Sequence, residues 1–103
     1  MRGLSHDETG AVARLDAAAM LQRAAQRGSA IAANRLARVL ASGRGVPADP
    51  VEAAKWHIIA RAHGESDLWL EGFLQELTPE QRQLGQKRAD GWLKPSLESS
   101  SRS

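Results

Sequence analysis

The feature that most constrains the fold of this chain is an internal register of 36 residues. When the sequence is shifted by 36 positions, small, large apolar and glycine residues recur in the same order. The matching pairs are Ala17 with Ala53, Ala18 with Ala54, Met20 with Trp56, Ala24 with Ala60 and Gly28 with Gly64. The Met20–Trp56 and glycine pairs are the most informative, because alanine is common throughout this chain. A period of this length is typical of repeated helix pairs that bury a shared core.

The composition favours helices over strands. The 103 residues include 18 Ala and 12 Leu but only 4 Val, 3 Ile, 1 Phe and no Tyr. Alanine and leucine are strong helix formers, whereas β-branched and aromatic residues dominate strands. The length is that of one small domain. We therefore expect an all-α fold in a single domain.

Helix boundaries are marked by local signals. Asp49 is a favourable N-cap, Pro50 suits the first helical position, and Glu52 completes a pattern resembling a capping box. This helix is expected to end at Gly64. The cap followed by proline recurs at Thr78 and Pro79, and Ser66 with Asp67 predicts a further helix start. The Gly43-Arg44-Gly45 segment is expected to form a tight turn in which both glycines have positive φ.

Together these signals predict about five helices joined by short connections, so that consecutive helices are antiparallel neighbours. The last of them is expected to end near Trp92 or Leu93. The expected organisation is a flexible N-terminus over 1–9, a helical repeat domain over 10–93 and a disordered serine-rich tail over 94–103.

Residues 30–64 carry a specific pattern. It consists of Leu36-Ala37, then Gly43-Arg44-Gly45-Val46, then Asp49, Ala53, Trp56, Ala60 and Gly64. This stretch resembles the Sel-one-like repeat family of tetratricopeptide-related helical repeats. Ala37 replaces the usual glycine and Leu40 the usual tyrosine. Residues 13–28 match only the second half of a unit, and residues 65–93 keep the outline of a helix pair without the motif. The resemblance implies a short α-solenoid.

The small residues of this pattern have a clear physical role. Alanine at 33, 37, 53 and 60 allows two helix backbones to approach closely, and Trp56 is expected to fill the gap between helix pairs. For Trp69 and Trp92 two alternatives stay open. Each is either buried, or exposed at a surface where a further repeat would dock.

The resemblance also implies a protein–protein interaction module that binds a peptide or partner domain on a concave face. By this resemblance, the candidate partner-binding residues lie along the first helix of the repeat: Ile31, Asn34, Arg38 and Ser42. The planar guanidinium of Arg38 suits a carboxylate. The alternative is that these residues form an ordinary solvated surface.

No catalytic, cofactor-binding or metal-binding residues are predicted, and the chain is not expected to be an enzyme. It has no Cys, which excludes thiolate chemistry and disulfides. His57 and His63 are six positions apart and do not share a helix face, so both are interpreted as surface or helix C-terminal residues. The Gly43-Arg44-Gly45 segment lacks the preceding strand and following lysine of a phosphate-binding loop.

Two other readings stay open. Residues 11–64 have a net charge of +5 and residues 65–103 one of −2, so a small basic nucleic-acid-binding protein is an alternative, although nucleic acid is the less favoured partner. The chain could also be a terminal capping segment of a longer solenoid, or form a homo-oligomer through open end faces. Without an apolar N-terminal stretch or a membrane-span candidate, a cytoplasmic location and no membrane partner are expected for the sequence as written.

Overall fold

The computed structural model describes residues 17–102, with side chains described over 17–93. A helix over 17–26 precedes α2 (Ala30–Ser42), α3 (Pro50–Ala62), α4 (Leu68–Glu76) and α5 (Pro79–Arg102). These are five helices, and the described residues contain no strand. The predicted all-α fold is confirmed.

The three predicted caps lie at helix starts, and one of them is only partly formed. The Thr78 cap is reciprocal, because Gln81 N–H donates to Thr78 Oγ1 and Thr78 N–H donates to Gln81 Oε1, both at 3.1 Å. Asp49 Oδ1 accepts from Glu52 N–H at 3.2 Å, but the Glu52 side chain does not return to Asp49. It pairs instead with Lys55 and with Arg88 of α5. The box at Asp49 is therefore only half formed, because the Glu52 carboxylate is held by cations.

The 36-residue register is visible in the hydrogen bonds that end two helices. Gly28 and Gly64 have φ values of 104° and 95°. In both places the residue after the glycine donates back to an alanine carbonyl. Ser29 N–H bonds Ala24 at 3.1 Å, and Glu65 N–H bonds Ala60 at 2.9 Å. The two helices thus end in the same way, each with a glycine cap of positive φ.

The turn between α2 and α3 also has the predicted conformation. Gly43 and Gly45 adopt φ values of 73° and 85°. Gly43 N–H donates to Val39 at 2.9 Å, and Asp49 N–H donates to Leu40 at 3.0 Å. These bonds satisfy carbonyls at the end of α2 and fix the point at which α3 starts.

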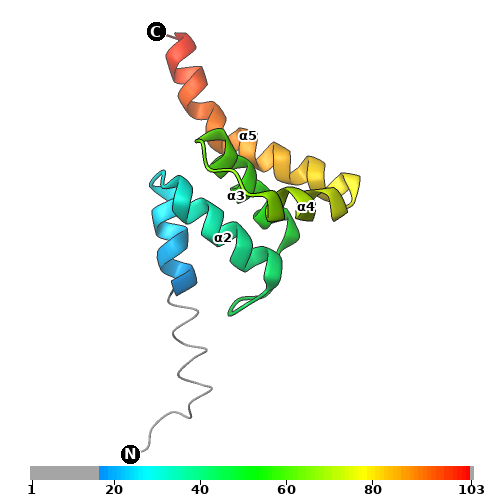
Figure 1. Cartoon of the computed structure of the whole chain (residues 1–103). Helices are drawn as coiled ribbons and strands as arrows, with labels where there is room; N and C mark the ends of the chain where they lie inside the picture. The colour runs from blue at the N-terminus through cyan, green and yellow to red at the C-terminus, as the bar shows by residue number, and fades with distance from the viewer. Residues whose placement is uncertain (1–16, 103) are drawn as a thin grey trace, which may run out of the picture.

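Helix α3 lies between α2 and α5 and packs along both (Figure 1). The alanines at 33, 37, 53 and 60 are all buried, as expected for close helix contacts. A close approach is also made by Gly85 of α5. A Cβ at this position would lie 2.7 Å from the Ala54 Cβ and 3.2 Å from the Val51 oxygen. Only glycine fits there without a shift of the helices.

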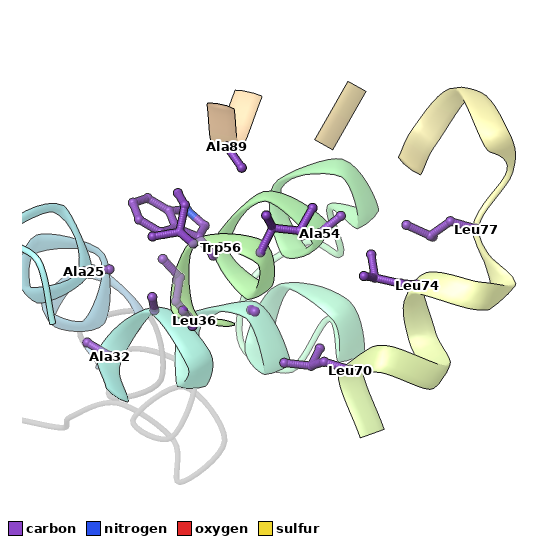
Figure 2. Close-up of a cluster of buried hydrophobic side chains, with 14 residues drawn as sticks. Ala25, Ala32, Leu36, Ala54, Trp56, Leu70, Leu74, Leu77 and Ala89 are labelled. Atoms are coloured by element: carbon purple, nitrogen blue, oxygen red, sulfur yellow. The ribbon is translucent and has the colours of Figure 1, made fainter. Parts of the chain in front are cut away.

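Trp56 is the largest side chain of the core and is 1% exposed, as predicted. Its ring lies between Leu36 of α2 and Ala89 of α5 (Figure 2). Trp92, which is half-buried, packs edge-on against it with the ring centroids 5.8 Å apart. Met20, which aligns with Trp56 in the 36-residue register, is instead 62% exposed. The two positions match in sequence but not in environment.

Helix α5 continues to Arg102, whereas the sequence predicted its end near residue 93. Pro95 removes one backbone donor, but its fixed φ is compatible with helical geometry, so helical dihedrals can continue through it. The predicted disorder of 94–103 stays a prediction, and the flexible segment 1–9 lies outside the described residues. Within the described residues, no helix combines the length and the apolar character that a bilayer crossing requires.

Candidate partner-binding surface

The four predicted partner-binding residues lie on one side of α2. Ile31 and Arg38 are exposed, Ser42 is exposed near the helix end, and Asn34 is partly buried. Their spacing follows the helical period, so they form a single stripe. The structure does not bring all four to one hollow: Arg38 and Ser42 share one, whereas Ile31 and Asn34 do not line it.

The carboxylate that Arg38 binds belongs to this chain. Arg38 Nε lies 2.6 Å from Asp67 Oδ2, and its terminal Nη2 lies 3.0 Å from Asp67 Oδ1. Asn34 Nδ2 donates to Asp67 Oδ2 at 2.8 Å. Asp67 also caps α4 by accepting from Leu70 N–H at 3.1 Å. One carboxylate therefore joins the predicted stripe on α2 to the start of α4.

This arrangement favours the ionised form of Asp67. The hydrogen bond from Arg38 is the largest cause, and those from Asn34 and the Leu70 amide add to it, so the pKa of Asp67 lies well below its usual range. Burial of the side chain, which is 6% exposed, opposes this effect without overcoming it. Asn34 and Arg38 are thus positioned by an internal contact, which the sequence analysis did not foresee.

A first hollow of about 350 Å³ lies next to this contact. Its lining residues come from α2, the following turn and α4: Arg38, Val39, Ser42, Arg44 and Trp69. The Arg38 guanidinium lies over the Trp69 ring, 5.3 Å from its centroid. Arg44 forms no ion pair with any described residue. The hollow is therefore lined by two cations and an aromatic ring, with no acidic side chain among its lining residues.

A second hollow of about 280 Å³ shares Trp69 with the first. It is lined along α4 by Leu68, Trp69, Gly72, Phe73 and Glu76. The Trp69 and Phe73 rings are nearly parallel, with an interplanar angle of 10° and a centroid distance of 6.2 Å. Trp69 is 50% exposed and Leu68 90% exposed. We call the residues lining the two hollows the Trp69 surface.

The Trp69 surface was only partly foreseen. The sequence analysis identified Arg38 and Ser42 and left the exposure of Trp69 open, but it did not place Arg44 and Gly72 on this surface. The sequence did contain a signal, because Trp69 and Phe73 are four residues apart and are therefore neighbours on a helix surface, with Gly72 between them. Nothing in local sequence places this pair beside Arg38, which belongs to another helix.

The histidines do not form a reactive cluster in the described structure. His57 was expected at the surface or near a helix end, and that expectation is wrong, because its side chain is fully buried. Its Nε2 donates to Glu71 Oε2 at 2.7 Å, and Arg61 donates to the same oxygen at 2.8 Å. These bonds, that from His57 foremost, lower the pKa of Glu71. The pair joins α3 to α4, and burial follows because α4 covers this side of α3.

His63 lies at the end of α3 as predicted, with Nδ1 3.0 Å from the Ile59 carbonyl oxygen. Among the described residues, no three His, Asp or Glu side chains come together in a group that could hold a metal ion.

Comparison of the chain with protein-family models, curated proteins and solved structures gives no match. The interpretation of the surface therefore depends on its residues alone.

Proposed function

We propose that this chain is a protein–protein interaction module, a helical-repeat scaffold of the Sel-one-like type that binds a peptide or partner domain on the face shared by α2 and α4. The observation that carries this proposal is the Trp69 surface. It combines a half-exposed tryptophan, an exposed leucine and two arginines around two adjoining hollows. Tryptophan and arginine are the residue types that most often dominate binding energy at protein interfaces.

The contacts that hold α4 against the α2–α3 unit support a role in recognition. The Arg38–Asp67–Asn34 contact and the His57–Glu71 pair both join α4 to the α2–α3 unit. Side chains on a surface held in this way lose little conformational freedom on binding, which favours affinity.

A second candidate role, as part of a longer solenoid or of an oligomer, is favoured by a separate observation. An apolar hollow of about 440 Å³ lies on the side of α2 that faces the helix over 17–26. Its lining residues are Ala18, Ala19, Gln22, Leu36, Leu40, Val46, Pro47 and Asp49. The exposed Met20 belongs to the helix over 17–26. Sedimentation at several concentrations tests the oligomer: association with rising concentration supports it, and a constant monomer mass counts against it.

The interaction role is tested by selection from a displayed library of random peptides on the immobilised protein. We expect enriched peptides that bind the wild type and lose binding to Trp69→Ala. Because half of the Trp69 side chain is exposed, this variant is expected to keep its helical circular dichroism. Leu84→Ala, at an exposed leucine on α5, serves as the matched control and should bind like the wild type. Equal binding to the wild type and Trp69→Ala would remove the proposal.

A further inference from the structure

Helix α4 contains a glycine that its own packing does not require. Gly72 lies in the middle of the helix, and a Cβ at this position would meet nothing within 4 Å. A glycine in a helix interior is destabilising relative to alanine, because it has more backbone freedom to lose on folding. Gly85 has a structural reason for its lack of a side chain, whereas Gly72 has none in the described contacts. What the missing side chain does provide is open space in the second hollow.

The two hollows differ in chemical character. The first has Arg38 and Arg44 as its only charged lining residues. Arg38 is already paired with Asp67, so Arg44 is the cation left for a ligand. The second hollow is lined mainly by Leu68, Trp69 and Phe73, with Glu76 as its only charged lining residue. A ligand that fits both hollows therefore needs a negative group beside an apolar one.

We infer that the Trp69 surface binds a linear peptide segment in which an acidic side chain stands next to a large apolar side chain. The carboxylate pairs with Arg44 in the first hollow, and the apolar side chain enters the second hollow at Gly72. Charge complementarity determines which group enters which hollow, because Glu76 repels a carboxylate from the second hollow. This inference rests on the proposed function and adds the chemistry of the partner.

The same residues favour a peptide over single-stranded nucleic acid. A nucleic-acid groove needs a track of cations for successive phosphates and free aromatic faces for the bases. Here one arginine is neutralised by Asp67, and Glu76 adds a negative charge. The ring of Trp69 already carries Arg38 over it and Phe73 stacked beside it. A base needs a free ring face to stack on, whereas an aliphatic side chain can also pack against the ring edge.

The test uses labelled synthetic peptides flanked by Gly and Ser, with binding measured by fluorescence anisotropy. One peptide contains two Glu-Leu pairs, and its counterparts contain Lys-Leu and Glu-Ser pairs. A single-stranded oligothymidylate is the nucleic-acid probe. We expect the Glu-Leu peptide to bind at least about tenfold more tightly than either counterpart, since each lacks one of the two matched groups. Arg44→Glu should reverse the order of the Glu-Leu and Lys-Leu peptides.

A pair of glycine variants separates binding from folding. Gly72→Gln fills the second hollow, and Gly91→Gln places the same side chain at another helical glycine whose Cβ would meet nothing within 4 Å. Both should raise the melting temperature by about 2–5 °C, because both replace a helical glycine with a better helix former. Only Gly72→Gln should weaken binding of the Glu-Leu peptide, by about fivefold or more.

Three outcomes overturn the inference: unchanged affinity in Gly72→Gln, no preference for Glu-Leu over Lys-Leu, or tighter binding of the oligothymidylate than of any peptide. These failures are distinguishable from failure of the proposed function. Library peptides that require Trp69 but lack the acidic–apolar pair would overturn the inference alone. Absence of any peptide that requires Trp69 would overturn both.

Discussion

Replacement of Asp67 by alanine tests whether one carboxylate fastens α4 to α2. The variant loses the N-cap of α4 and the hydrogen bonds from Asn34 and Arg38. Loss of an N-cap costs about 1 kcal/mol, and the unpaired, partly buried Asn34 amide about another 1 kcal/mol. The Arg38 pair adds less than about 1 kcal/mol, because the Arg38 side chain is half exposed to water. The free energy of unfolding should therefore fall by about 2–3 kcal/mol.

Asp67→Asn is the matched control that divides this loss. Asparagine is as good an N-cap as aspartate, so the hydrogen bond to Leu70 N–H can be kept. The charge is lost, and so is the acceptor oxygen Oδ2, which faces both Arg38 and Asn34. We expect a loss of about 1–1.5 kcal/mol, which leaves a difference of about 1 kcal/mol between the two variants as the contribution of the cap.

Urea unfolding followed by far-ultraviolet circular dichroism measures these differences, provided that the slope with denaturant stays the same. A loss below about 1 kcal/mol in Asp67→Ala would show that the contact contributes no more than an exposed ion pair. Equal losses in Asp67→Ala and Asp67→Asn would show that the cap at α4 contributes nothing. The first result would refute the view that Asp67 joins the two helices, and the second would refute the contribution assigned to its cap.

Three further outcomes are expected. Gly85→Ala should lower the free energy of unfolding by about 1–3 kcal/mol, because its Cβ would lie 2.7 Å from the Ala54 Cβ; urea titration that shows wild-type stability would contradict the close approach. Trp56→Ala should cost about 3–5 kcal/mol, measured in the same way, since it empties the centre of the core. The folded chain lowers the pKa of Asp67. The stabilisation by its ionised carboxylate is therefore complete above about pH 4, its usual pKa in the unfolded chain, and is lost as the pH falls further. Between about pH 5 and 2, the melting temperature should therefore fall more steeply with decreasing pH for the wild type than for Asp67→Asn.

The parts of the fold that sequence predicted correctly are those set by a few neighbouring residues. The cap at Thr78 and the positive φ angles of Gly43 and Gly45 each depend on contacts within about one helical turn. The half-formed box at Asp49 shows where such reasoning stops. Its second half was lost to Arg88, which lies 36 residues away in sequence.

The candidate site could not be predicted from the sequence because its contacts cross between helices. Arg38 and Asp67 are separated by 29 residues, and only the packing of α4 beside α2 brings them together. The burial of His57 has the same origin, since Glu71 comes from α4. Helical spacing correctly grouped Arg38 and Ser42 on one face. It could not show that the carboxylate suited to Arg38 was already supplied by the chain.

The contact between α3 and α5 shows how much of the repeat pattern continues after residue 64. Counted from their caps at Asp49 and Thr78, Trp56 and Gly85 occupy the same position, and so do the buried alanines 60 and 89. The large residue of one helix thus corresponds to the glycine of the next. Gly85 lets the α5 backbone approach α3 directly, and the aromatic ring comes instead from Trp92, which packs on the edge of Trp56. Small and large residues still complement each other, because Ala89 of α5 lies in the core beside Trp56 of α3. At a shift of 36 residues, Ala53 falls on Ala89 and Trp56 on Trp92, so this part of the register continues into α5 although the two caps are only 29 residues apart. The later positions no longer match in residue type, because packing requires complementary volumes across the contact and not identical residues along the chain.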